Sequence, residues 1–171
     1  PQDVDLLLPL IRELLDAARC SVKELDAIAF GAGPGTFTGV RIACGVAQGL
    51  ALGSNLPVVP VSSLLALAAS STHDKVIAAL DARMDEIYHA AYERVAGQWQ
   101  CVSPPRVCSA SAAPLLAGAG WFGVGSGFKA HDAALRERYA GALTGVDATA
   151  EPSAGAWGDP ATNIGEPMTF A

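Results

Sequence analysis

The sequence has few charged residues and no cluster of basic ones. Its 171 residues include 11 lysines and arginines against 17 aspartates and glutamates, which gives a net charge of −6, and the basic residues are scattered along the chain. A protein that binds nucleic acid by itself normally carries a basic patch, because neutralising phosphates supplies most of the affinity. The composition therefore argues against direct binding of RNA or DNA.

The sequence also lacks the cysteine and histidine patterns of a metal site. Its four cysteines form no CxxC pair and no short ladder with histidines, so neither a zinc site nor a disulfide framework is indicated. We expect reduced, mostly buried thiols in a cytoplasmic protein. The cysteines are Cys20, Cys44, Cys101 and Cys108.

Signals for secretion or membrane insertion are missing as well. No signal peptide is recognisable, and the longest apolar stretch is interrupted by Arg41, Gln48 and several glycines, which excludes a membrane span. The chain begins with Pro1 rather than Met, so we expect an N-terminal piece of the protein to be missing.

The spacing of the apolar residues predicts helices and strands in alternation, which is typical of an α/β protein. A polar segment at residues 71–75 divides the chain into an N-terminal lobe (1–72), a second lobe (73–145) and an irregular tail (146–171). The expected helices cover residues 6–18, 36–53, a segment capped by Ser62 or Ser63, and 131–143. The expected strands are a short buried one at 24–30, one at 56–61, two within 75–95 around a turn at 81–85, and one from residue 120 that leads into a Gly-Ser-Gly turn.

The stretch GAGPGTFTGVRIACGVAQGLALG, residues 31–53, joins a glycine turn to a helix. It has no P-loop lysine, and Thr36 stands where a dinucleotide fingerprint has its third glycine. A helix N-terminus after a glycine turn can still receive an anion. Arg41 lies near this terminus, where it faces an anion, pairs with a carboxylate or reaches water. The stretch is thus a phosphate cradle or a packing surface.

Small residues line two neighbouring rows of this helix, one from Gly45 to Gly53 and one from Gly39 to Ala51. Glycine inside a helix costs about 0.5 to 1 kcal/mol relative to alanine, so the pattern predicts the close approach of another backbone. The covering element is either the first helix of the same chain or another protein. The residues expected to contact a partner are Leu7, Leu10, Ile11, Leu14, Gly35, Thr36, Thr38, Arg41, Gly45 and Gly49.

Three segments resemble one known family. They are LDAIAFGAGPGTFTGVRIACGVAQGLALGSNLPVVPVSSLLALA (25–68), ALDARMDEIYHAAYE (79–93) and GVGSGF (123–128). These residues are similar to the TsaB (YeaZ) family of tRNA threonylcarbamoyladenosine biosynthesis proteins, a paralogue of TsaD that was formerly classed with the glycoproteases (peptidase M22-like). The resemblance implies a two-lobe, actin-like ATPase fold (ASKHA, ribonuclease H-like). Because the family begins with further strands and an Asp-Thr-Ser motif that are missing here, it also implies a truncated N-terminal lobe.

The positions of the paralogue's catalytic groups hold other residues in this sequence. Ser62 and Ser63 stand where TsaD-like sequences have Asn-His, and Leu67 stands at their second metal-binding histidine. The turn at residues 81–85 occupies the place of the second-lobe phosphate loop, but it has Ala, Arg and Met where that loop has glycines. The resemblance therefore implies no metal site and no catalytic residue.

The remaining candidates for chemistry are few. His73, His89 and His131 are far apart in the sequence, and we expect them on the surface or in turns. Gly125 and Gly127 are candidates for a remnant of the adenosine-side turn of a nucleotide site. No cofactor is expected.

The resemblance implies a non-catalytic scaffold or activator subunit of the tRNA threonylcarbamoyladenosine (t6A) machinery. Its helical pair would dock on the catalytic TsaD-like subunit or on a second copy of itself. A TsaE-like ATPase would join through the complex, tRNA would be contacted only indirectly, and no membrane would be involved. The alternative is a glycoprotease-like metallohydrolase or an ASKHA-type nucleotide-binding enzyme, in which Asp81, Asp85 or Glu86 moves a proton; a solvated turn is the competing role of these acids.

Overall fold

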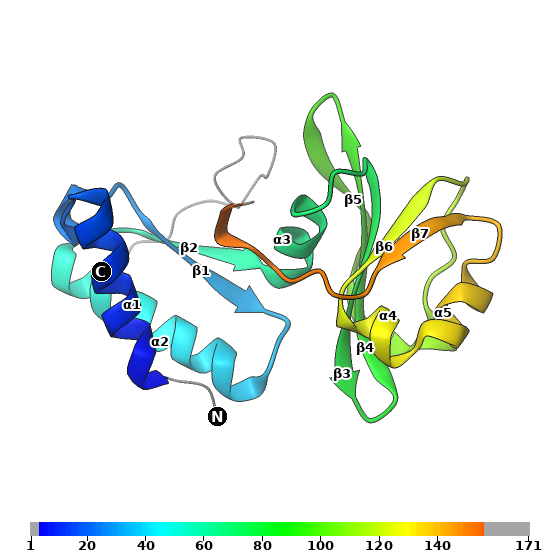
Figure 1. Ribbon diagram of the computed structural model, residues 1–171, viewed down its shortest axis with the longest axis horizontal. Coiled ribbons are helices and arrows are strands. Elements are labelled where there is room, and N and C mark those ends of the chain that lie inside the picture. The colour runs from blue at the N-terminus through cyan, green and yellow to red at the C-terminus, as the bar shows by residue number, and fades with distance from the viewer. Residues whose placement is uncertain (1–3, 156–171) are drawn as a thin grey trace. The chain divides into compact units, whose positions relative to one another are not determined.

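The computed structural model describes residues 4–155, which divide into two compact units (Figure 1). The first unit contains residues 4–32 and 36–60, and the second contains residues 33–35 and 61–155. The expected boundary after residue 72 differs from this division because helix α3 (Ser63–Ala69) packs its leucines on the sheet of the second unit. Most of the expected tail, residues 156–171, lies outside the described residues.

Helix α2 dominates the first unit and agrees with the prediction for residues 36–53. The hydroxyl of Thr36 accepts a hydrogen bond from the Gly39 N–H at 3.2 Å and caps the helix, and Asn55 ends it in the left-handed conformation. No helix within residues 4–155 is both long and apolar enough to cross a membrane. The elements of this unit are α1 (Val4–Ala18), the 3₁₀ turn η1 (Val22–Glu24), β1 (Ile28–Gly33), α2 (Phe37–Ser54) and β2 (Val58–Ser62), and the two strands pair with each other.

Strand β1 begins later than predicted. The Glu24 carboxylate accepts hydrogen bonds from the backbone N–H of Ser21 at 2.7 Å and from its hydroxyl at 2.8 Å. This capping box holds residues 22–24 in a 3₁₀ turn, because local side-chain hydrogen bonds compete with an extended backbone. The strand is also only partly buried, so the expectation of a buried strand over residues 24–30 is wrong.

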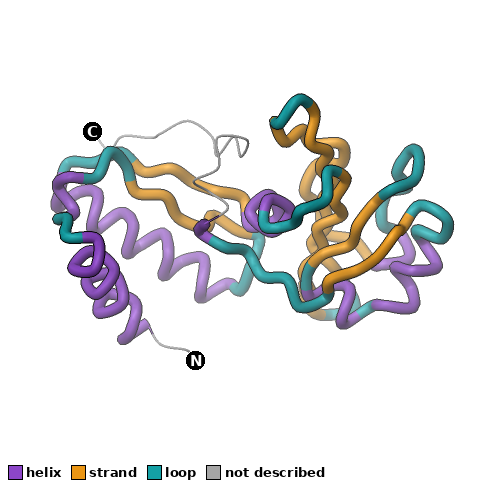
Figure 2. Tube along the Cα trace, turned by 45° about the horizontal axis from the view of Figure 1, so that its top comes forward, coloured by secondary structure: helices purple, strands orange, loops and turns teal. Residues whose placement is uncertain are grey.

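The second unit is built on a mixed sheet, whose strands are orange in Figure 2. It has five strands in the order β5-β4-β3-β6-β7. Strands β3, β4 and β5 are antiparallel neighbours, whereas β6 and β7 run parallel to β3. The two strands predicted around a turn at residues 81–85 are confirmed as the hairpin of β3 and β4. After α3, the elements are β3 (Lys75–Arg83), β4 (Glu86–Val95), β5 (Gln98–Ser109), the 3₁₀ turn η2 (Ala110–Ala112), β6 (Trp121–Val124), α4 (Ser126–Ala130), α5 (Asp132–Arg138) and β7 (Leu143–Asp147).

Helices cover both faces of this sheet (Figure 1). Alternate residues of a strand point to opposite faces, and β3 follows this rule throughout its buried part. Ile77 and Ala79 pack in one cluster with residues of α4 and α5, and Val76 and Ala78 pack in the other with α3. Strand β3 is therefore buried on both sides and forms the centre of the core.

Two strands of the sheet and one helix were not predicted. Strand β5 contains Pro104 and Pro105, which weaken a strand prediction but are tolerated on the edge of a sheet. Strand β7 takes up the end of the predicted helix 131–143 and the first residues of the predicted tail. The expected Gly-Ser-Gly turn instead starts the short helix α4 at Ser126.

The four cysteines carry free thiols. Cys101 is exposed on β5 and the other three are half-buried, so the expectation of mostly buried thiols is wrong. Partial burial raises the pKa of the Cys108 thiol, which stays protonated at neutral pH and is a poor nucleophile.

His89 is fully buried on β4, which contradicts the expectation of a surface or turn histidine. Its Nε2 lies 2.8 Å from the hydroxyl of Tyr139, which donates to the Pro114 carbonyl oxygen at 3.0 Å. This geometry assigns the ring hydrogen to Nε2 and leaves Nδ1 buried without a hydrogen-bond partner among the described residues. Burial lowers the pKa of His89 to about 4, and the charge of Arg106 acts in the same direction. The imidazole is therefore neutral in the folded protein.

We expect the free energy of unfolding to decrease as the pH falls from 6.5 to about 4. Below pH 6.5 the unfolded chain binds a proton on His89 that the folded chain does not bind, so stability present above this pH is progressively lost. The loss is on the order of 3 kcal/mol. Urea unfolding of wild type and His89→Gln between about pH 7 and about pH 4 measures it.

In His89→Gln this part of the pH dependence should disappear. His73→Gln is the matched control, because His73 is exposed and stacks on Phe122 with ring centroids 3.7 Å apart. Equal pH dependence in wild type and His89→Gln would show that the buried imidazole does not control acid stability.

Candidate functional site

Helix α1 carries more apolar surface than the described part of the chain covers. Its inner face is formed by Leu7, Ile11 and Leu15, which follow helical spacing and are half-buried. Of the predicted contact residues, Leu7 and Ile11 lie on this inner face, whereas Leu10 and Leu14 are exposed. Four leucines of α1 have exposed fractions between 51% and 70%, namely Leu6, Leu8, Leu10 and Leu14. The charged residues of α1, among them Arg12, Glu13 and Asp16, share one side of the helix, so its apolar face is wider than the inner face that the described residues cover.

Gly45, Gly49 and Gly53 form an open row along α2. A Cβ atom added at any of the three would meet no atom within 4 Å. On the opposite side of the helix, Ala47 and Ala51 are only 3% and 1% exposed and form its buried face. The close approach predicted for the glycine row is therefore not supplied by α1 or by any other described residue, and the row is a surface without Cβ atoms on which another helix can lie closely.

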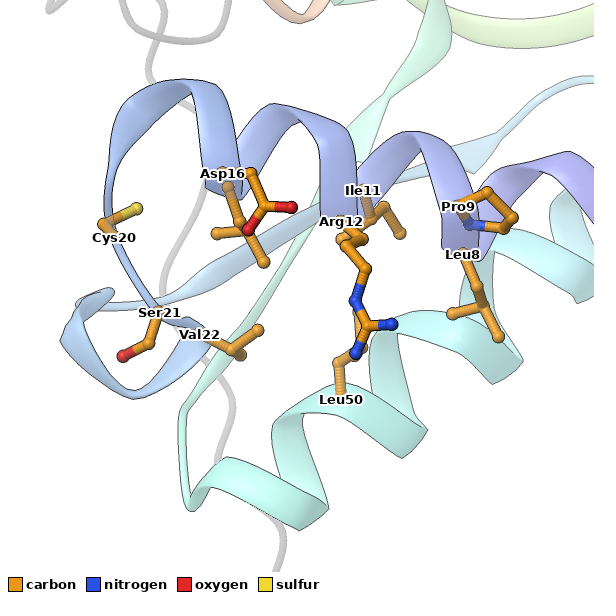
Figure 3. Close-up of a pocket in the computed structure, with 10 residues that line it drawn as sticks. Leu8, Pro9, Ile11, Arg12, Asp16, Cys20, Ser21, Val22 and Leu50 are labelled. Carbon is orange, nitrogen blue, oxygen red and sulfur yellow. The ribbon is translucent and has the colours of Figure 1, made fainter.

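A groove of about 680 Å³ lies between α1, residues 20–22 and α2 (Figure 3). Leu8 and Ile11 come to it from α1, and Leu50 comes from α2. Figure 3 shows the Arg12 guanidinium extending toward Leu50. The lining combines apolar surface with the opposite charges of Arg12 and Asp16, which suits the side chains of another protein better than a small polar substrate. The lining residues are Leu8, Pro9, Ile11, Arg12, Leu15, Asp16, Cys20, Ser21, Val22 and Leu50.

The N-terminus of α2 places Arg41 on an aromatic ring. Its guanidinium carbon lies 3.2 Å from the ring centroid of Phe37, a cation–π contact between residues four apart on the helix. Arg41 is exposed, which agrees with the alternative that it reaches water. Its stacking on Phe37 was not predicted, and the i, i+4 spacing was the signal that could have revealed it. Phe37 is 74% exposed, and the predicted contact residues Gly35, Thr36 and Thr38 are exposed beside it. The site therefore extends from the glycine row to this end of α2.

The residues at the Asn-His and second-histidine positions of TsaD-like sequences include two with structural roles here. The hydroxyl of Ser62 accepts a hydrogen bond from the Leu65 N–H at 3.4 Å and caps α3, as predicted. Leu67 is fully buried in the core. Within residues 4–155, no three histidine, cysteine, aspartate or glutamate side chains come together where they could hold a metal ion.

In the hairpin between β3 and β4, a carboxylate of the chain itself binds the groups that could otherwise face a phosphate. The Asp81 carboxylate accepts a hydrogen bond from the Arg83 N–H at 2.9 Å and lies 3.4 Å from the Arg83 guanidinium. In a phosphate loop, backbone N–H and cationic groups of this kind face the ligand. Here the carboxylate occupies them, while Asp85 and Glu86 are exposed. The hairpin is thus arranged as a self-contained solvated turn.

Gly125 and Gly127 are explained by close packing within the second unit. A Cβ atom on Gly125 would lie 2.5 Å from the Ala79 carbonyl oxygen and 2.6 Å from Leu67, and its φ of +100° disfavours other residues. A Cβ atom on Gly127 would lie 2.8 Å from that of Ala79. Both glycines therefore let α4 approach β3, and this packing accounts for them without a nucleotide.

We expect Gly125→Ala to lower the free energy of unfolding by about 3 kcal/mol, because the new methyl group overlaps β3 and the backbone is strained. Gly97→Ala is the matched control, since Gly97 also has a positive φ of +80° but has no atom within 4 Å of the added Cβ. It should lose only about 1 kcal/mol. Urea unfolding measures both, and equal losses would contradict the packing explanation.

The family model "TsaD: tRNA N6-adenosine threonylcarbamoyltransferase" matches residues 3–120. Two curated relatives bear the name tRNA threonylcarbamoyladenosine biosynthesis protein TsaB. The one from Haemophilus influenzae is 39% identical over 154 residues, which is 82% of this chain and 64% of the relative. The one from Escherichia coli is 46% identical over 92 residues, which is 52% of this chain and 40% of the relative. The chain thus spans less than two thirds of the length of either relative.

A solved structure is also similar. The structure titled "YeaZ from Pseudomonas aeruginosa" matches with a TM-score of 0.79 and 40% identity, covering 90% of this chain and 72% of that one. Together with the family match, this likeness confirms the expected actin-like α/β fold and the resemblance seen in the sequence.

Proposed function

Because the chain belongs to the TsaB (YeaZ) family, within the wider TsaD family, we propose that it is a non-catalytic scaffold or activator subunit in t6A biosynthesis. Its partner is a TsaD-like catalytic subunit that docks on the helical pair α1 and α2. A TsaE-like ATPase joins the assembly through this complex, tRNA is contacted only through it, and the assembly works in the cytoplasm.

The observation that carries the proposal is the open glycine row of α2 beside the exposed leucines of α1. Gly45 and Gly49 leave the α2 backbone accessible, and Leu10 and Leu14 offer apolar side chains at 51% and 70% exposure. Burying apolar surface contributes about 25 cal/mol per Å², and the missing Cβ atoms permit a short distance between helix axes. Two helices of a partner can therefore pack on this pair as in a four-helix arrangement.

A second copy of the chain can use the same surface. Its helical pair is self-complementary in the sense that small residues on α2 can accept leucines of a partner's α1. The homodimer and the complex with the TsaD-like subunit are then mutually exclusive, and their balance depends on the two concentrations.

No specific observation favours the catalytic alternative. Leu67 is a core residue where a metal ligand would stand, and the Asp81 carboxylate is engaged by Arg83. Gly125 and Gly127 are accounted for by their packing on Ala79.

We expect Gly49→Leu to weaken the complex with the TsaD-like subunit about tenfold or more, because the leucine side chain holds the partner helix away from α2. The substitution should leave the fold intact or stabilise it slightly, since the site is open and leucine is the better helix former. Size-exclusion chromatography with light scattering shows whether the complex is lost. Calorimetric titration gives the fold-change in the dissociation constant.

Ala133→Leu is the matched control, because Ala133 is an exposed residue of α5 in the second unit. It places a leucine side chain on another exposed helix, with one carbon less added than in Gly49→Leu, and should leave binding unchanged. A wild-type chain that binds neither the TsaD-like subunit nor itself would refute the scaffold function. Binding that is equal in Gly49→Leu and wild type would place the interface elsewhere.

A further inference from the structure

The tip of the β3–β4 hairpin holds three consecutive non-glycine residues in the left-handed conformation. Arg83, Met84 and Asp85 have φ angles of 67°, 53° and 60°. A tight hairpin turn favours Asn and Gly at such positions, because other side chains are strained there. The chain thus maintains a strained turn whose central residue is a methionine.

Met84 is also the most exposed of the large hydrophobic side chains in the described part of the chain, at 93%. Its neighbours hold the turn in one shape. The Asp81 carboxylate binds the N–H and the guanidinium of Arg83, and the Asp81 N–H donates to the Ser126 hydroxyl at 3.1 Å. An apolar side chain on a rigid turn loses little conformational freedom when it enters a pocket, which favours its use as an anchor.

The charges around Met84 indicate the chemistry of the partner. The tip contains one basic residue, Arg83, and three acidic ones, Asp81, Asp85 and Glu86. No ion pair of the described residues involves Asp85 or Glu86, so these charges are available to a partner. An apolar pocket with a rim of lysine or arginine is complementary to this tip. Nucleic acid is not, since its phosphates repel the acidic side chains.

We propose that the hairpin tip is a second docking element for the TsaD-like subunit, with Met84 inserted in an apolar pocket whose basic rim faces Asp85 and Glu86. The identity of this partner rests on the proposed function. A subunit that modifies tRNA carries lysine and arginine to hold phosphates, so it offers the basic surface that the tip requires. The contact uses residues of the second unit, whereas the helical pair belongs to the first.

The test measures the dissociation constant of the full chain with its TsaD-like subunit by calorimetric titration. Met84→Gly should weaken binding about tenfold while raising the midpoint of thermal unfolding, because glycine accepts the left-handed conformation without strain. A role of Met84 in stability alone would not move the two quantities in opposite directions. Met84→Leu, which keeps an apolar side chain, should bind almost as well as wild type.

Leu115→Ser is the control for exposed apolar residues in general, because Leu115 is 70% exposed outside the hairpin. It should bind like wild type. The double variant Asp85→Asn with Glu86→Gln should weaken binding and reduce its salt dependence. If wild type binds and Met84→Gly binds equally well, the hairpin contact is refuted while the helical docking stands. If wild type does not bind at all, the proposed function fails and the hairpin contact fails with it.

Discussion

Apolar surface that the first unit cannot bury by itself is the constraint on which this account depends. Two strands and two helices give α2 a buried face at Ala47 and Ala51, but they leave the leucines of α1 and the glycine row of α2 uncovered. Because the exposed leucines of α1 are already about half covered, each gives up roughly 1–2 kcal/mol of the energy that full burial would supply. Association with the proposed partner would recover this energy, and the groove at Leu50 is the proposed entry for its side chains.

The second unit satisfies its own requirements. Ala78 and Ala79 on the central strand are small enough to let helices approach both faces, and Gly125 and Gly127 complete the contact with α4. Gly125 and Gly127, which the sequence alone indicated as candidates for a nucleotide site, are thus part of this close packing. Among the described residues of this unit, strain and high exposure coincide at Met84 in the hairpin tip.

Local sequence signals predicted the elements whose stabilisation is local. Helical periodicity and caps located α1, α2 and the start of α3, because hydrogen bonds within a few residues define them. Strands β5 and β7 were missed because their stability comes from pairing with distant strands, which no local pattern reports. The site was predicted as a set of helix residues, and the openness of Gly49 and the stacking of Arg41 on Phe37 became visible only in three dimensions. Local sequence patterns could not predict the burial of His89 either, because its hydrogen-bond partner Tyr139 lies fifty residues away in the sequence.

Hydrogen–deuterium exchange of the chain, alone and saturated with its TsaD-like subunit, tests the central claim most directly. Amides exchange more slowly where binding suppresses local opening, so the docking surface is read from the protected peptides. The account predicts protection over α1, residues 4–18, and over α2, residues 37–54. A stable complex with unchanged exchange in both helices would contradict it.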